Sequence, residues 1–130
     1  MVLQTGPNCK RLKQGERVVV HFGAHSKYAI WPESIPIAYS DLPMDQAALL
    51  VISSFPAEGV RKTRLEFGEC AMVIGLGILG LMAVQLCRVA GAVPVIVVDP
   101  NPERRSMALA IGADYALDPT EEGFLTESGR

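Results

Sequence analysis

The chain has 130 residues, enough for one domain with a real core, and its hydrophobic content of 49% is compatible with a buried sheet. The formal net charge is −2 and no basic run occurs, which argues against nucleic acid as a partner. Cys9, Cys70 and Cys87 show no CxxC spacing, so we expect free thiols in a reduced, cytoplasmic protein. The first ten residues lack the basic start and apolar block of a signal peptide.

Residues 1–42 are rich in glycine and proline, which interrupt short extended runs. The pattern predicts three short strands, at Arg17–Phe22, Ser26–Ile30 and Ile35–Ile37. We expect the aromatic side chains of this region to cover a small core rather than to line a substrate pocket; they are Tyr28, Trp31 and Tyr39.

His21 and His25 are the two histidines of the sequence. A spacing of four would place both on one face of a helix, but the intervening Phe22-Gly23-Ala24 and the preceding valines favour a strand and a turn. Neither histidine has a neighbouring acid or thiol in the sequence to complete a metal site. We therefore expect surface or interface groups and predict no metal ligands.

Helical patterning begins at Met44. A short helix is predicted to end near Leu50, and a second helical segment is predicted from Ala57 to Arg64. Pro56 is expected to divide the two, because proline has no N–H to donate and its ring clashes with the preceding turn. The turn Phe67-Gly68-Glu69 then leads into an apolar strand.

The stretch that follows predicts a strand, a glycine turn, a helix and a second strand. Cys70–Ile74 is a continuous apolar run, as expected for a strand buried on both faces. A helix is predicted over Ile78–Ala90, with Gly91 as a left-handed stop. The second strand, Val93–Asp99, is rich in β-branched residues and ends on a carboxylate.

The run from Gly75 to Gly80 carries the expected chemistry. Gly75 and Gly77 lie where the chain must turn sharply and where a pyrophosphate would approach the backbone more closely than a Cβ permits. Gly80 would let the helix pack against its strand. Because the helix begins near Ile78, its unpaired N–H groups and the positive end of its dipole would face the phosphates. The predicted pyrophosphate site therefore consists of Gly75, Gly77, Ile78, Leu79 and Gly80.

Asp99 follows Gly80 by 19 positions, close to the about 20 residues expected for a carboxylate that hydrogen-bonds a ribose diol. A carboxylate there repels a 2′-phosphate, which favours NAD over NADP. Asn101 is predicted to cap the next helix, in whose first turn Arg104 either reaches adenosine or remains solvated.

A third short strand is predicted at Tyr115–Leu117, after a helix that ends at Gly112. Three strands joined by two helices make one mononucleotide-binding half of a doubly wound sheet. The predicted fold class is therefore α/β, a Rossmann-type parallel half-sheet preceded by a short β-rich segment.

Other interpretations of this region stay open. An S-adenosylmethionine site uses a similar glycine turn and a similar acid, and a non-catalytic nucleotide-binding or assembly module would pair its open sheet edge with another copy. A membrane span is not expected: residues 71–87 carry no charge, but a span needs about 20 apolar residues, and three glycines and Gln85 interrupt this run.

Four segments carry a family resemblance by their order and separation: Asn8–Val19, Asp45–Leu49, Phe67–Glu69 with the glycine run that follows it, and Ile111–Asp114. Over residues 6–119 the chain resembles the medium-chain dehydrogenase/reductase family, in its zinc-type group of alcohol, polyol and sugar dehydrogenases. The resemblance implies transfer of hydride between the nicotinamide of NAD and a small alcohol or ketone. It also implies that the run from Gly75 to Gly80 holds the pyrophosphate, that Asp99 holds the ribose, and that Arg104 lies beside the adenosine.

The departures from the family pattern concern the metal. The family's zinc ligands lie mostly before the position equivalent to Asn8, and the place of a third ligand falls near Val51, which cannot bind zinc. Zinc is thus an option for full-length relatives and is not supported here, and no catalytic residue is assigned.

The resemblance also implies how the chain is divided. Residues 1–42 correspond to the end of a GroES-like catalytic domain, 43–66 to connecting helices, 67–119 to the NAD-binding half and 120–130 to a flexible tail. The sheet half that would hold the nicotinamide is absent, so we expect a fragment that is inactive or very weakly active alone. A homo-oligomer is expected.

Overall fold

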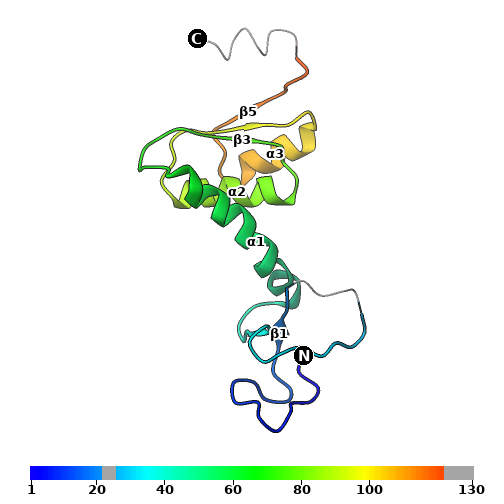
Figure 1. Ribbon diagram of the computed structural model, residues 1–130. Helices are drawn as coiled ribbons and strands as arrows, with labels where there is room; N and C mark the ends of the chain where they lie inside the picture. The colour runs from blue at the N-terminus through cyan, green and yellow to red at the C-terminus, as the bar shows by residue number, and fades with distance from the viewer. Residues whose placement is uncertain (22–25, 122–130) are drawn as a thin grey trace. The chain divides into compact units, whose positions relative to one another are not determined.

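The computed structural model describes residues 1–21 and 26–121 (Figure 1). The chain divides into two compact units, residues 1–52 and 53–130. In the first unit, β1 (Val18–Val19) pairs antiparallel with β2 (Ile37–Ala38), with Val18 opposite Ala38. Arg17 supports this pairing, because its guanidinium lies 4.7 Å from the centre of the Tyr39 ring.

Two expectations for the first unit are wrong. Residues Ser26–Ile30 form no strand; the side chain of Ile30 is fully exposed, and no described segment pairs with this stretch. An extended run without a neighbouring strand cannot form the hydrogen-bond ladder of a sheet. Tyr28 is exposed rather than part of a core, whereas Trp31 and Tyr39 are half-buried. His25 lies outside the described residues.

Helix α1 (Met44–Thr63) is continuous, which corrects the prediction of two helices divided at Pro56. Proline removes one hydrogen bond to the preceding turn, and helical bonding resumes beyond it. The following turn is supported by Glu58, whose carboxylate lies 2.7 Å from Arg61 Nη2 and 3.8 Å from Lys62 Nζ. No helix in the described part of the chain is long and apolar enough to cross a bilayer.

The second unit contains the predicted half-sheet. The strands β3 (Ala71–Ile74), β4 (Val95–Val98) and β5 (Tyr115–Leu117) are parallel and adjacent in that order. They are joined by α2 (Ile78–Val89) and α3 (Pro102–Ala110). Because successive crossovers in one direction are right-handed, both helices lie on the same face of the sheet (Figure 1).

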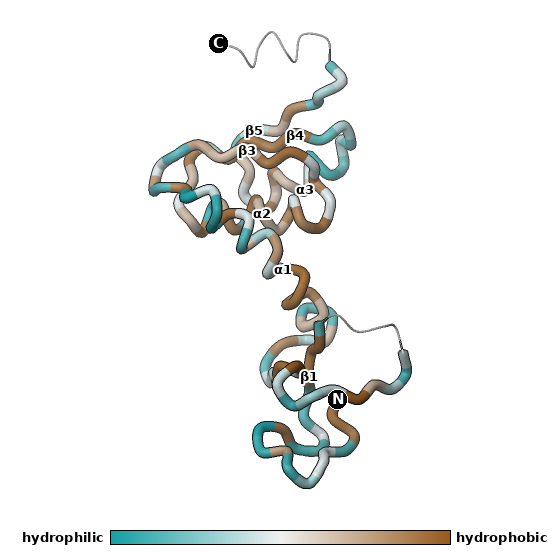
Figure 2. The backbone as a smooth tube through the Cα atoms, viewed as in Figure 1, coloured by the Kyte–Doolittle hydropathy of each residue, from teal (hydrophilic) through white to brown (hydrophobic). Residues whose placement is uncertain are grey.

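The core lies between that face and the two helices. It comprises Val73, Leu76, Val84, Cys87, Ala92, Val95, Val97, Ala108 and Ala113. Figure 2 shows hydrophobic colouring along β3 and β4. The buried thiol of Cys87 has a raised pKa because burial disfavours the thiolate, whereas Cys70 is exposed just before β3.

The expectation that β3 is buried on both faces is wrong. Met72 is 51% exposed and Ile74 78% exposed, while Val73 between them is buried. Met72 pairs with Ile96, and Ile96 pairs with Tyr115, so Met72 and Tyr115 lie on the same face of the sheet. Because Tyr115 is also exposed, the exposure belongs to that one face. An apolar run alone does not show whether both faces of a strand are covered.

Candidate nucleotide-binding site

The predicted site residues meet where parallel strands end. The glycine turn follows β3 and Asp99 follows β4, while Asp118, which the sequence did not predict, follows β5. Because the carboxyl ends of parallel strands share one edge of the sheet, these segments come together there, as is usual for ligand sites of open α/β sheets.

The three glycines of the turn differ in why they are needed. Gly75 has φ +89°, a conformation that favours glycine, and its N–H donates to the carbonyl oxygen of Val98 at 2.8 Å. An added Cβ at Gly77 would meet no described atom within 4 Å, whereas a Cβ at Gly80 would lie 1.9 Å from the carbonyl oxygen of Gly75. Gly75 thus makes the turn, Gly77 leaves open space above it, and Gly80 allows close packing of α2.

Helix α2 begins at Ile78 with an uncapped N-terminus. Gly77 is its N-cap residue and, among the described residues, no side chain accepts a hydrogen bond there and no acid lies in the first turn. Helix geometry leaves the first N–H groups of α2, those of Ile78, Leu79 and Gly80, without intrahelical partners. Together with the helix dipole, these groups make a place for an anion beside Gly77.

Asp99 is the buried acid of the site, with 4% of its surface exposed. Its Oδ2 accepts a hydrogen bond from the backbone N–H of Leu76 at 2.7 Å, and its Oδ1 accepts one from the N–H of Asn101 at 2.8 Å. The hydrogen bond from the Leu76 N–H, followed in size by the one from the Asn101 N–H, holds the pKa of Asp99 below its ordinary value. The positive charge of Arg104 adds to the effect. The carboxylate is therefore ionised at neutral pH and joined directly to the glycine turn.

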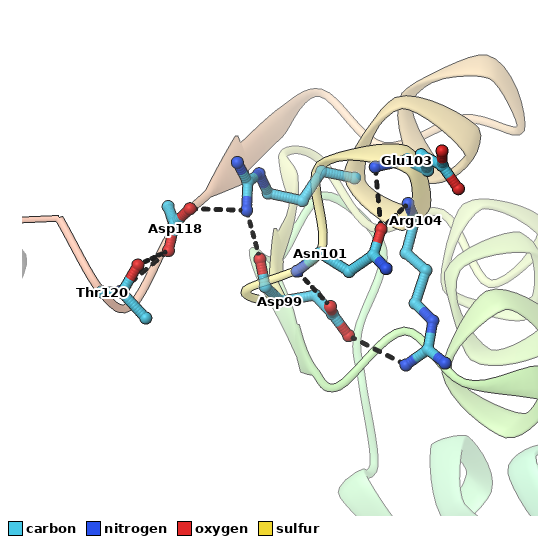
Figure 3. Close-up of polar contacts among 7 residues, drawn as sticks. Asp99, Asn101, Glu103, Arg104, Asp118 and Thr120 are labelled. Carbon is cyan, nitrogen blue, oxygen red and sulfur yellow. Dashed lines mark hydrogen bonds and ion pairs between the residues drawn. The ribbon is translucent and has the colours of Figure 1, made fainter.

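The start of α3 surrounds this carboxylate (Figure 3). The side chain of Asn101 accepts hydrogen bonds from the N–H groups of Glu103 and Arg104 at 2.9 and 3.1 Å, which confirms the predicted cap. Arg104 Nη1 lies 4.0 Å from Asp99 Oδ2 while the side chain stays 54% exposed. Arg104 is therefore solvated and also adjacent to Asp99, and its contact with adenosine stays a prediction.

Sequence reasoning missed Arg105 and Asp118. Arg105 Nη1 donates to the carbonyl oxygen of Asp99 at 2.6 Å and lies 2.8 Å from Asp118 Oδ2. Asp118 also accepts hydrogen bonds from the N–H and hydroxyl of Thr120 (Figure 3). The pairing joins residues 13 positions apart, and nothing in their local sequence marks it.

An open apolar cavity of about 860 Å³ adjoins the glycine turn. It is lined by Gly75 and residues 77–80 on one side, and by residues of α1 and β3 that include Phe55, Val60, Met72 and Ile74. Its lining does not include Asp99 or Arg104, so it meets the polar site only at the turn.

The described residues do not fit a metal site. Within residues 1–21 and 26–121, no three His, Cys, Asp or Glu side chains gather closely enough to hold an ion. Val51, at the place of a family zinc ligand, lies in α1 and has no ligating atom.

A parallel β-α-β-α-β unit with a glycine turn and an acid after the second strand defines the class of dinucleotide-binding α/β domains. The family model of zinc-binding dehydrogenases matches residues 79–128, a stretch that includes Gly80, Asp99 and Arg104. The chain belongs to the zinc-type medium-chain dehydrogenase family.

Individual relatives agree with this family. An L-threonine 3-dehydrogenase from Pyrococcus horikoshii is 34% identical over 115 residues, which cover 81% of this chain and 30% of the relative. The structure of 2R,3R-butanediol dehydrogenase from Bacillus subtilis matches with a TM-score of 0.80 and 25% identity, over 97% of this chain and 44% of that one. A zinc-binding dehydrogenase from Sinorhizobium meliloti, bound to NADP, matches with a TM-score of 0.62 and 27% identity, over 68% and 26% of the two chains.

Proposed function

We propose that this chain binds the adenosine and pyrophosphate end of NAD in a dehydrogenase that moves hydride between nicotinamide and a small alcohol or ketone. The chain spans 30% of the length of the L-threonine 3-dehydrogenase it matches, so the activity is that of the whole protein. The observation that carries the proposal is the ionised, buried carboxylate of Asp99, held by the Leu76 N–H beside an uncapped helix N-terminus.

The pyrophosphate is assigned to the turn and the start of α2. Its oxygens would accept hydrogen bonds from the N–H groups at Ile78, Leu79 and Gly80, and the open space at Gly77 would let them approach the backbone. Gly75 and Gly80 contribute by shape, since one makes the turn and the other keeps α2 close to it.

The ribose is assigned to Asp99. An ionised carboxylate has about four acceptor sites. Two are used by Leu76 and Asn101, so the ribose diol would find the remaining ones. A 2′-phosphate would meet a negative charge there, which favours NAD, although Arg104 lies 4.0 Å away and would offset part of the repulsion. The related Sinorhizobium meliloti structure contains NADP, so the cofactor preference is what an experiment must decide.

The nicotinamide ring, when bound, supplies the hydride chemistry. The residues of this chain bind and orient the adenosine end, and we expect the 130 residues alone to turn over little or no substrate. Relatives named for L-threonine and butanediol are the basis for proposing a small alcohol or ketone substrate. All three cysteines are free thiols, which accords with the further proposal of a reducing, cytoplasmic location.

Ligand-dependent melting of the full chain tests the proposal. NADH and ADP-ribose should raise the melting temperature, because a ligand that binds only the folded state stabilises it. NADPH should do so less, and S-adenosylmethionine should have no effect. A shift with S-adenosylmethionine alone would replace the proposal with a methyltransferase-like site.

A matched pair of carboxylate variants tests whether Asp99 binds the ribose. Asp99→Asn should weaken ADP-ribose binding about tenfold, since the site loses its charge and an acceptor. Glu103→Gln removes the same charge from the exposed first turn of α3 and should leave the affinity unchanged. Equal affinity of Asp99→Asn and the unaltered chain would refute the ribose assignment.

A second candidate is a nucleotide-binding module that assembles with another copy. The exposed apolar side chains of Met72, Ile74 and Tyr115 on one sheet face favour it. Light scattering on the purified chain is the test, and a monomer at high concentration would exclude this candidate.

A further inference from the structure

The consecutive arginines of α3 lie in different surroundings. The Arg104 side chain is 54% exposed on the carboxylate side of Asp99. The Arg105 side chain is only 18% exposed, and its Nη1 contacts two acceptors at once. These are the main-chain carbonyl oxygen of Asp99, at 2.6 Å, and Asp118 Oδ2, at 2.8 Å. Arg105 therefore contacts the backbone of Asp99 and not its carboxylate.

The carboxylate of Asp118 is held by hydrogen bonds of its own. Its side chain is 15% exposed, and its Oδ1 accepts hydrogen bonds from the Thr120 N–H at 2.9 Å and the Thr120 hydroxyl at 2.6 Å. These bonds, more than Arg105, hold the pKa of Asp118 below its usual range. Asp99, Arg105, Asp118 and Thr120, which we call the strand-end clasp, thus join the ends of β4 and β5 through α3. A further bond, from the Asp99 N–H to the carbonyl oxygen of Leu117, runs beside it at 3.2 Å.

We propose that Arg105 is a positioning residue for dinucleotide binding: by holding the Asp99 carbonyl against Asp118, it sets where the Asp99 carboxylate lies relative to the glycine turn. The inference rests on the proposed function. The carboxylate is fixed at its tip by the N–H groups of Leu76 and Asn101, and the clasp fixes the backbone from which it projects. A binding group needs to be held within about 0.5 Å and 10–20° of its productive position, so both supports matter.

The chain supplies a matched control at the opposite ends of the strands. Arg88 of α2 lies 3.1 Å from Asp114 Oδ2 and donates to the carbonyl oxygen of Ala92. Asp114 in turn accepts a hydrogen bond from the N–H of Val95, the first residue of β4. Arg88 therefore makes the same kind of ion pair and carbonyl contact, remote from Asp99.

The first test measures ribose recognition by calorimetry. The ligands are ADP-ribose and its analogue that lacks the adenosine 2′-hydroxyl, and the ratio of their affinities reports the Asp99 contact independently of the folded fraction. Arg105→Met and Asp118→Asn should each reduce that ratio about tenfold, toward one. The double variant should lose no more than either alone, because both break the same clasp. Arg88→Met should keep the original ratio.

The second test needs no ligand. If the clasp holds the carboxylate against Leu76, amide exchange at Leu76 should accelerate about tenfold in Arg105→Met and Asp118→Asn. Exchange at Gly75, whose N–H is bonded to Val98, should stay constant. Arg88→Met should change neither amide.

The outcomes separate the two proposals. An unchanged affinity ratio together with unchanged Leu76 exchange in folded Asp118→Asn would overturn the role of Arg105, even if Arg105→Met fails to fold. If the unaltered chain does not bind ADP-ribose, the proposed function fails, and Leu76 exchange alone still decides whether Arg105 positions Asp99.

Discussion

An alanine at position 80 would place its Cβ 1.9 Å from the carbonyl oxygen of Gly75 and 2.9 Å from the carbonyl carbon. Ordinary contact begins at 3.4 Å, so α2 and the turn would have to separate by about 1.5 Å. Overpacking costs about 1–3 kcal/mol in general, and alanine in a helix recovers up to about 1 kcal/mol relative to glycine. The clashing atoms here are backbone and cannot rotate away, so the upper end of the overpacking range applies, and we expect Gly80→Ala to lose about 2 kcal/mol after the helix-propensity gain.

Gly77→Ala is the matched comparison. No described atom lies within 4 Å of a Cβ at position 77, and its φ of −68° suits any residue. We expect its stability to stay within about 0.5 kcal/mol of the unaltered chain. The new methyl would nevertheless occupy the space assigned to pyrophosphate, so the affinity for ADP-ribose should fall at least about tenfold.

Urea unfolding followed by circular dichroism measures the stabilities, and calorimetry with ADP-ribose measures the affinities. We expect Gly80→Ala to lower the stability and Gly77→Ala to lower the affinity for ADP-ribose. Gly80→Ala with unaltered stability would refute the packing argument. Gly77→Ala with unaltered affinity would refute the place assigned to the pyrophosphate.

Three further outcomes are expected. Asp99 has a lowered pKa in the folded chain, so its contribution to stability should be complete above its ordinary pKa of 3.8 and should be lost as the pH falls through the lowered value. The urea midpoint of Asp99→Asn should therefore fall less on acidification than that of the unaltered chain. Val97→Ala, at a fully buried position, should lower the unfolding free energy by about 2 kcal/mol. Ile74→Ala, at a position 78% exposed, should change it by less than about 0.5 kcal/mol. Similar losses in the two variants would contradict burial of one sheet face. Asn101→Ala should cost about 1 kcal/mol in the same assay through loss of the α3 cap, and an unchanged midpoint would show that the cap is not needed.

The half-sheet could be predicted because its signals are local. Three β-branched or apolar strands, the left-handed stop at Gly91 and the cap at Asn101 each depend on a few neighbouring residues. The predicted and observed bounds of β5 agree, and α2 differs from the prediction by one residue at its end. Asp99 could likewise be selected by spacing, because the length of a helix between two strands fixes where the second strand ends.

The errors involve contacts that a local pattern does not contain. The sequence predicts two helices divided at Pro56, but the loss of one hydrogen bond does not prevent helical turns on either side of it. The apolar run Cys70–Ile74 predicts a strand covered on both faces, yet coverage depends on where the helices pack. Arg105 and Asp118 escaped notice because only the folded sheet brings the ends of β4 and β5 together.

The hydrogen bond from Leu76 to Asp99 has a consequence for redesign. The same carboxylate that is assigned to the sugar also fastens the bend after β3 to the end of β4. Retargeting the chain toward a 2′-phosphorylated coenzyme by deleting that acid would therefore loosen the scaffold as well as alter selectivity. A workable replacement must be uncharged and still accept the Leu76 amide, which narrows the choice to short polar side chains such as serine or asparagine.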